Sequence, residues 1–204
     1  MKSTASTKAG LLAGIPGSGL LASMPAFAAK TELTLGAAAV DVGTLDPHYA
    51  SSTSDRILSA WIFGGLVRFA PGSTDPATIE ADLAESWQAS DDRLVWTFKL
   101  RPGVKWSNGD PVTAADYVFG WQRLVDPATA SEYAYYLELA QVVNAAAITA
   151  GEKPVTDLGV KAVDDMTFEV TLIEPLPYFT KMLTNSSTFP APKAVIEKFG
   201  ADWT

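Results

Sequence analysis

The chain contains no cysteine and only one histidine, His48, among its 204 residues. These absences exclude thiol catalysis, disulfide bonds and zinc sites built from cysteine or from several histidines. A serine–histidine–aspartate triad would have to use His48, and no Gly-x-Ser-x-Gly segment accompanies it. No loop has the acidic spacing of an EF-hand. We therefore expect no catalytic residue, no metal site and no cofactor, and a protein that is not an enzyme.

Basic residues are also scarce. The chain has 15 lysines and arginines and 23 aspartates and glutamates, which gives a formal charge of −8. Binding to phosphate backbones requires clustered lysine and arginine, so we expect no nucleic-acid partner. Hydrophobic residues make up 48% of the chain, and this share predicts a packed core rather than disorder.

No segment beyond the N-terminal region approaches the roughly 18 uninterrupted apolar residues of a membrane span. Residues 1–28 have the order of an export signal: Lys2 and Lys8, an apolar middle, and the small-x-small triplet Ala26-Phe27-Ala28. A disordered tail is the alternative. Cleavage after Ala28 would remove two lysines and no acid, which changes the formal charge from −8 to −10. We expect an exported, periplasmic protein whose mature chain does not insert into the membrane.

Hydrophobic periodicity predicts a mixture of strands and helices. Alternation predicts strands around residues 33–35, over 93–100 and in two segments joined at Asp164-Asp165. Segment 56–69 is mostly apolar and predicts a buried helix weakened by Gly64-Gly65 near its end. The polar segments before and after it predict loops. Strands and helices do not alternate regularly, and this order favours an α+β fold over a doubly wound sheet.

Residues 113–126 predict a helix with well-marked ends. Thr113 and Asp116 have the spacing of a capping box, and Asp126-Pro127 stops the helix. Its buried stripe is expected to include Trp121, and the apolar face of the preceding strand includes Trp96. Both tryptophans are therefore predicted to be core, whereas Trp106, between two turns, stays ambiguous. Further helices are expected over 132–150, ending at Gly151, and over 192–200.

Few residues remain as candidates for a functional site. His48 is interpreted as a structural histidine, and the pairs Asp91-Asp92 and Asp164-Asp165 as turn residues. An exported hydrolase that uses such acids stays open as an alternative. Tyr133 and Tyr136 share a helical face in the expected 132–150 helix, while Tyr135 projects elsewhere. A tyrosine near the start of that helix can wall a ligand cleft.

Several motifs occur together in a familiar order. They are "TLDPH" (44–48), "LAESW" (83–87), "VWTFKLRPGVKWSNGDPVTAADYVFGWQRLVDP" (95–127), "TDLGVKAVDDMTFEVTL" (156–172) and "PKAVIEKFG" (192–200). From Leu45 to Trp203 the chain closely resembles the periplasmic oligopeptide-binding proteins of bacterial ABC importers, which are family 5 extracellular solute-binding proteins. The resemblance implies a periplasmic binding protein-like fold, with two lobes that close over a ligand and an extra domain.

The resemblance also implies a domain order. Residues 29–63 and 191–204 would belong to one ligand-binding lobe, and residues 64–190 would form the extra α+β domain. Family members are more than twice as long, so the chain is expected to be truncated after the N-terminal portion. Peptide binding by residues 30–204 alone is then expected to be weak or absent, and a fragment without binding activity is one alternative.

The implied function is the non-covalent capture of short peptides for delivery to an ABC permease in the inner membrane, by a monomer. The implied peptide-binding residues are Ser51, Ser52 and Thr53, whose backbone would pair with an extended peptide, and Tyr133, which would line the pocket. Family members commonly carry an acidic residue, glycine and valine where this chain has Ser51–Thr53. That departure leaves another ligand, such as a murein peptide, open.

Overall fold

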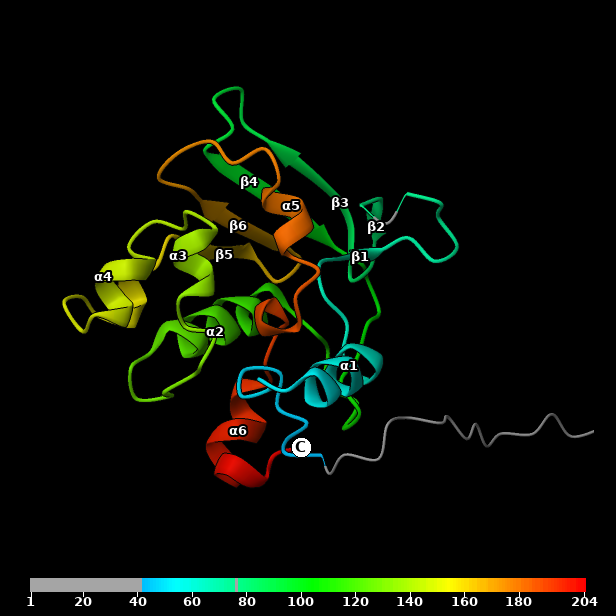
Figure 1. Ribbon diagram of the computed structural model, residues 1–204, viewed down its shortest axis with the longest axis vertical. Helices are drawn as coiled ribbons and strands as arrows, with labels where there is room; N and C mark the ends of the chain where they lie inside the picture. Colours follow the sequence, from blue (N-terminus) through cyan, green and yellow to red (C-terminus); the bar gives the residue numbers. More distant parts are fainter. Residues whose placement is uncertain (1–41, 76) are drawn as a thin grey trace, which may run out of the picture. The chain divides into compact units, whose positions relative to one another are not determined.

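A computed structural model describes residues 42–75 and 77–204. The predicted export signal in residues 1–28 and the predicted strand around 33–35 lie outside the described residues. The described part is built from both strands and helices, which confirms the α+β prediction (Figure 1).

The centre of the fold is a four-stranded antiparallel sheet with the order β3-β4-β6-β5 (Figure 1). Its strands are β3 (Ala84–Ala89), β4 (Val95–Leu100), β5 (Val160–Asp164) and β6 (Thr167–Thr171). Phe98 pairs with Phe168 across β4 and β6, and both side chains are fully buried. The alternation that predicted β4 and the β5–β6 hairpin is thereby confirmed.

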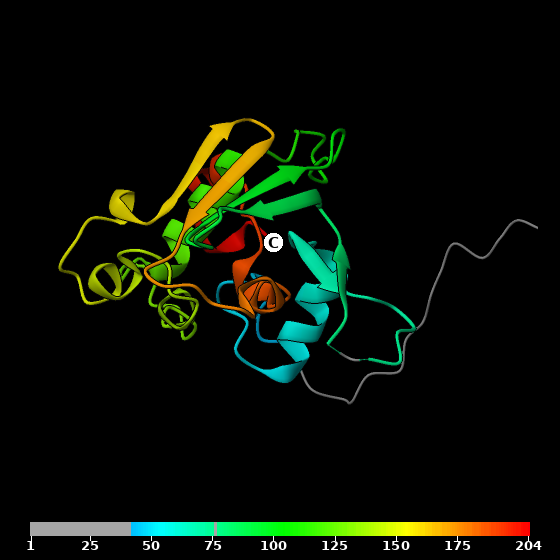
Figure 2. The ribbon, with the colours of Figure 1, turned by 90° about the horizontal axis from the view of Figure 1, so that it is seen from above.

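Helix α2 (Ala114–Val125) packs against this sheet. The carboxylate of Asp116 accepts a hydrogen bond from the backbone N–H of Thr113 at 2.8 Å, and the predicted capping box is present. Tyr117, Trp121 and Leu124 are fully buried, which confirms the predicted burial of Trp121, and the helix ends at Asp126. Figure 2, a view from above, shows α2 beneath the β5–β6 hairpin.

Aromatic rings fill the space between α2 and the sheet. The Phe168 ring lies 5.2 Å from that of Trp121 and 5.4 Å from that of Tyr117, centroid to centroid. Trp96 is half-buried and contacts Phe179, with 5.5 Å between their ring centroids. The tryptophan prediction is therefore confirmed fully for Trp121, while Trp96 lies at the edge of the core.

The predicted helix over 132–150 is wrong. Two short helices, α3 (Tyr136–Leu139) and α4 (Ala145–Thr149), replace it, and Gln141 and Asn144 between them have φ of 59° and 66°. The chain breaks there because Val142 forms a β-bridge with Leu172 at the end of β6. These sheet contacts override the local helical preference. Gly151, with φ of 76°, follows α4 as predicted.

The prediction for 56–69 is partly wrong. Helix α1 (Thr53–Ile62) begins inside the predicted loop and ends before the glycines, and β1 (Val67–Phe69) pairs with β2 (Ile79–Ala81). Position 65 requires glycine, because a Cβ there would lie 2.6 Å from the Phe189 ring. The buried face of helix α1 is also not the apolar face that the prediction expected. Trp61 is 57% exposed, whereas Asp55 and Ser59 face inward.

The remaining elements are short and lie mostly in the C-terminal part. They are η1 (Val155–Asp157), α5 (Phe179–Met182), η2 (Ser186–Thr188), α6 (Lys193–Phe199) and η3 (Gly200–Asp202). The predicted final helix is confirmed as α6. In Figure 1, α6 lies on the side of α2 away from the sheet.

Candidate functional site

A group of buried and half-buried polar side chains joins segments that are far apart in the sequence. We name it the polar junction and define it as Asp46, His48, Arg123, Ser131 and Trp203. Arg123 donates two hydrogen bonds to the Asp46 carboxylate, at 3.0 and 2.7 Å. The indole N–H of Trp203 donates a third, at 2.7 Å. Planar two-point pairing of this kind fixes orientation as well as distance.

His48 occupies the centre of the polar junction and is 1% exposed. Its Nδ1 lies 2.8 Å from Nη1 of Arg123, and its Nε2 lies 3.2 Å from the carbonyl oxygen of Phe189. A guanidinium only donates hydrogen bonds, so Nδ1 accepts and Nε2 carries the proton. His48 is thus a neutral histidine with both ring nitrogens in use, and this environment favours the structural interpretation over a catalytic one.

The electrostatics of the polar junction follow from its burial and its charges. Burial lowers the pKa of His48 to about 4. It outweighs the opposite effects of Asp46 and of the Phe189 carbonyl, and the charge of Arg123 lowers the pKa further. Burial acts to raise the pKa of Asp46, but hydrogen bonds from Arg123 and Trp203 lower it below its ordinary value. At neutral pH the junction is therefore a paired carboxylate and guanidinium around a neutral imidazole.

The polar junction positions the start of α1. The hydroxyl of Ser59 on α1 donates to the Leu45 carbonyl at 3.3 Å, next to Asp46. Asp55, in the first turn, accepts a hydrogen bond from the backbone N–H of Gly43 at 2.9 Å. Ser52 is the N-cap, and its hydroxyl accepts from the Asp55 N–H at 3.1 Å. Inward-facing polar groups thus hold α1 by its first two turns.

The predicted binding residues Ser51, Ser52 and Thr53 lie at this helix start. All three are exposed, and Thr53 is already the first residue of α1. The predicted loop before residue 56 is therefore shorter than expected, because Ser52 caps a helix at that point. Within the described residues, no hydrogen bond occupies the backbone N–H of Ser51 or of Ser52. These groups remain open to a ligand backbone.

Tyr133 lies beside the same helix start. Its hydroxyl accepts a hydrogen bond of 2.6 Å from Nη1 of Arg56, one turn into α1, and the guanidinium carbon lies 4.9 Å from its ring centroid. Its backbone N–H donates to the Ser131 hydroxyl, which in turn donates to the His48 carbonyl at 2.6 Å. The structure thereby brings the predicted residues of the helix start and Tyr133 together.

The prediction for Tyr135 is wrong. Because residues 132–135 form a turn rather than a helix, the ring of Tyr135 stacks on that of Tyr133, with centroids 5.8 Å apart and planes 25° apart. Tyr136 lies beside Tyr133 as predicted, with ring centroids 6.4 Å apart, and its hydroxyl donates to the Met182 carbonyl at 3.0 Å. Tyr133 is half-buried and Tyr135 is exposed, so this pair presents an aromatic surface beside α1.

Sequence reasoning missed Arg56, Arg123 and Trp203. Arg56 contacts Tyr133, and Arg123 contacts Asp46, across separations of 77 residues in both cases. No local spacing signals such contacts. The only hint was the Asp46-Pro-His48 sequence, in which the His48 N–H donates to the Asp46 carboxylate at 2.9 Å as in an Asx turn.

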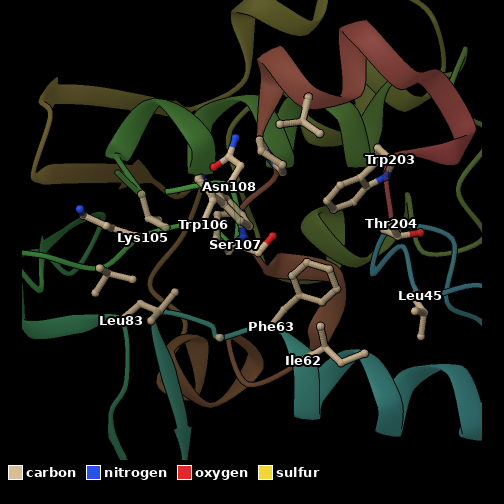
Figure 3. Close-up of a pocket in the computed structure, with 16 residues that line it drawn as sticks. Leu45, Ile62, Phe63, Leu83, Lys105, Trp106, Ser107, Asn108, Trp203 and Thr204 are labelled. Atoms are coloured by element: carbon tan, nitrogen blue, oxygen red, sulfur yellow. The ribbon is translucent and has the colours of Figure 1, made fainter. Parts of the chain in front are cut away.

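A separate pocket of about 440 Å³ lies at the other end of α1 (Figure 3). Residues 62–64, residues 104–108 and Trp203 line it, and Trp106 contributes one wall. Phe63 and Trp203 lie next to each other, with ring centroids 5.7 Å apart (Figure 3). The helix of 10 residues separates this pocket from Ser52 by about 15 Å. The ambiguous Trp106 is thus a pocket residue remote from the predicted site.

The paired acids do not form an enzyme-like site. Asp91 and Asp92 lie in the turn between β3 and β4, and Asp164 and Asp165 lie at the turn between β5 and β6. All four are exposed rather than enclosed by a cavity. Their turn positions agree with the prediction and supply no pair of carboxylates aimed at a shared ligand.

Comparison with known proteins assigns the chain to a family. The family model for "Bacterial extracellular solute-binding proteins, family 5 Middle" matches residues 78–204. The chain belongs to the family 5 solute-binding proteins. Members of this family are named for the solutes they bind rather than for a reaction. No helix within residues 42–75 and 77–204 is long and apolar enough to cross a membrane.

Individual family 5 relatives agree with this assignment. The periplasmic oligopeptide-binding protein OppA of Salmonella typhimurium is 50% identical over 165 residues, which are 80% of this chain and 29% of OppA. The crystal structure of Haemophilus influenzae OppA with a bound peptide, RPPGFSPFR, matches with 44% identity and a TM-score of 0.74, over 78% of this chain and 30% of that one. The fold prediction of a periplasmic binding protein is confirmed.

A murein-peptide binder of the same family is also similar. The structure of the Escherichia coli murein tripeptide binding protein MppA matches with 40% identity and a TM-score of 0.72, over 79% of this chain and 30% of that one. The chain thus spans about 30% of the length of the relatives that it matches.

Proposed function

We propose that this chain takes part in capturing short peptides, as the periplasmic solute-binding component of an ABC importer. The observation that carries the proposal is the 50% identity over 165 residues with a periplasmic oligopeptide-binding protein. The chemistry required is recognition without bond making. A peptide backbone offers regularly spaced N–H and C=O groups, and an open chain segment pairs with them whatever the side chains are.

The helix start and Tyr133 are the proposed peptide contacts. Ser51, Ser52 and Thr53 are exposed, and the backbone N–H groups of Ser51 and Ser52 have no partner among the described residues. Tyr133 lies beside α1, where its hydroxyl accepts a hydrogen bond from Arg56, one turn into the helix. A peptide laid over the start of α1 would meet open backbone donors first and the Tyr133 ring next.

We also propose a division of the chain into lobe and extra domain. Residues 64–190 would form the extra α+β domain, and residues 29–63 and 191–204 would belong to a ligand-binding lobe. The buried apolar cluster supports this division, because its members all fall between Leu66 and Leu183. The polar junction crosses the boundary, since Asp46 contacts both Arg123 and Trp203.

Export and delivery complete the proposal. Residues 1–28 would direct the chain to the periplasm and be removed after Ala28, and the mature protein would deliver its ligand, as a monomer, to an inner-membrane permease. The relatives named as periplasmic binding proteins support this location. The intact mass of the protein from a periplasmic extract measures the cleavage directly, and an unprocessed mass would contradict it.

Titration of the 15N-labelled chain with tripeptides, followed by NMR, tests the binding. NMR detects even millimolar affinity, so it also registers contact with a ligand that the chain holds weakly. We expect Ala-Ala-Ala to shift the amide signals of Ser51, Ser52 and Thr53 along one saturating curve. Tyr133→Ala should lower the affinity that the curve gives. Phe199→Ala, which changes an exposed aromatic on α6, should leave the affinity unchanged.

The same titration separates the peptide proposal from its nearest rival. The similarity to MppA supports a murein tripeptide as the second candidate ligand. An affinity for murein tripeptide at least tenfold higher than for Ala-Ala-Ala would favour that candidate. If neither ligand shifts the helix-start signals at millimolar concentration, peptide capture by this chain is wrong.

A further inference from the structure

Arg56 is an arginine without a carboxylate partner in the described part of the chain. Arg68 pairs with Glu80 at 2.7 Å and Arg123 pairs with Asp46 at 2.7 Å, but no ion pair within residues 42–75 and 77–204 includes Arg56. Glu132, which precedes Tyr133 in sequence, forms no ion pair with Arg56 in this part of the chain. The single hydrogen bond of the Arg56 side chain goes to the hydroxyl of Tyr133 at 2.6 Å.

The environment of Arg56 makes this state unusual. The side chain is half-buried, and the guanidinium lies against the Tyr133 ring, 4.9 Å from its centroid. A guanidinium has five N–H donors, of which one is used here, and a phenol oxygen supplies no negative charge. A cation that is partly withdrawn from water and not neutralised favours an anion at its open side.

The position of Arg56 makes that open side part of the proposed peptide site. Arg56 and Thr53 are three residues apart on α1 and therefore neighbours on its surface. Tyr133 fixes the direction of the guanidinium, and the backbone N–H of Arg56 donates to the Ser52 carbonyl at 3.1 Å, so Arg56 lies one turn from the open backbone N–H groups of Ser51 and Ser52. A fixed fork suits the planar, two-oxygen geometry of a carboxylate.

We propose that Arg56 is a specificity-determining residue that selects peptides carrying a carboxylate next to the part of the backbone held at the start of α1. This inference rests on the proposed peptide-binding function. The carboxylate comes either from an acidic side chain or from the peptide's own C-terminus, since both offer the same group. A local cation gives this preference although the chain as a whole has a charge of −8, which at long range attracts cationic ligands instead.

Matched tripeptides test the preference by NMR titration of the full chain. Ala-Glu-Ala against Ala-Gln-Ala isolates a side-chain carboxylate, and Ala-Ala-Ala against its C-terminal amide isolates the terminal one. For the wild type we expect the carboxylate member of one pair to bind about tenfold tighter, as charge-assisted hydrogen bonds allow. The bound carboxylate should also shift the side-chain Nε–H signal of Arg56.

Substitutions then assign the preference to Arg56. Arg56→Gln should reduce the affinity ratio within the responsive pair to about one, and Arg56→Lys should retain part of it, because lysine keeps the charge but not the fork. Arg93→Gln, which removes an exposed arginine from the β3–β4 turn, should leave the wild-type ratio. Dispersed amide spectra confirm that each variant is folded.

The outcomes separate the two proposals. If the peptides bind but both ratios are near one in the wild type, or if Arg56→Gln leaves the ratio as it was, the role of Arg56 is wrong while peptide capture stands. If none of the four peptides binds, the proposed function fails, and the inference fails with it.

Discussion

Two regions of the molecule meet on one helix. The apolar core lies on one face of α2, where Trp121 packs against Phe168 with ring centroids 5.2 Å apart. The polar junction lies two residues further along, where Arg123 holds Asp46 through two hydrogen bonds. Residues two apart on a helix point in different directions, so a single helix serves both environments.

The two regions stabilise the molecule in different ways. Burial of apolar rings is favourable in proportion to area and has little directional requirement. The polar junction depends on direction, because a buried ion pair gains little over an apolar pair of equal volume but is strongly destabilised when one partner is lost. The core therefore holds the domain together, whereas the junction determines where the loop from Leu45 to Ala50 and the start of α1 lie.

The largest expected effect comes from emptying the core. Phe168→Ala removes a fully buried ring that contacts the rings of Phe98, Tyr117 and Trp121. The free energy of unfolding at pH 7, measured with urea, should fall by about 3 to 5 kcal/mol. Ile173→Ala, at a site that is 62% exposed, serves as control and should change it by less than about 0.5 kcal/mol.

The core prediction also concerns acidity. The rings in contact with Phe168 belong to Phe98, Tyr117 and Trp121, and none of these changes its charge between pH 7 and pH 5. The loss caused by Phe168→Ala should therefore be equal at both values. A loss that grew toward pH 5 would mean that the core and the polar junction are one coupled unit, and the comparison between them would no longer hold.

A somewhat smaller effect is expected from breaking the ion pair in the polar junction. Arg123→Met leaves the Asp46 carboxylate buried without its counter-ion, and the free energy of unfolding at pH 7 should fall by about 3 kcal/mol. Arg68→Met breaks an ion pair of equal length on the surface and should cost no more than about 1 kcal/mol. Equal losses in the two variants would contradict the distinct character of the buried pair.

A double variant sharpens the result. Asp46→Asn with Arg123→Met removes both charges, so the loss should be clearly smaller than the sum of the two single losses. Simple additivity would show that Asp46 and Arg123 act independently, in conflict with their two short hydrogen bonds.

Much of the fold was predictable where the determinants are local. The alternation in β4, the turn between β5 and β6 and the capping box of α2 are each encoded within about ten residues, and the structure has all three. The single helix over 132–150 failed because Val142 is drawn into contact with Leu172, a residue whose influence no window around Val142 contains. Local propensity is a weak prior against such contacts.

The burial of α1 was mispredicted for a related reason. An apolar composition suggested an inward-facing apolar side, yet Asp55 and Ser59 face inward and bond to Gly43 and Leu45. Those partners are in a loop that has no periodicity from which to predict its own position. For the site, the resemblance supplied Ser51–Thr53 and Tyr133, but only the folded structure shows that Arg56 joins them.

The smallest of these effects is a change with pH that belongs to the polar junction alone. His48 has an ordinary pKa of 6.5 and a pKa of about 4 in the fold, because it is buried and Arg123 occupies its Nδ1. Below about pH 6.5, His48 therefore binds a proton in the unfolded chain but stays neutral in the folded chain until the pH approaches 4. Stability is full above that pH and falls as the pH drops toward 4. Between pH 7 and pH 5 the loss should be about 2 kcal/mol.

His48→Asn isolates that effect. Asparagine can still offer an oxygen to Arg123, but it does not titrate, and His48 is the single histidine of the chain. Urea denaturation of the variant should give a lower free energy of unfolding at pH 7 but a nearly flat dependence down to pH 5. The depressed pKa of Asp46 adds its own loss only at lower pH, which starts as the pH falls through the ordinary carboxyl pKa of 3.8 and continues below it. If the variant kept the wild-type slope, the acid sensitivity would lie outside the polar junction, and His48 would be charged or accessible in the fold.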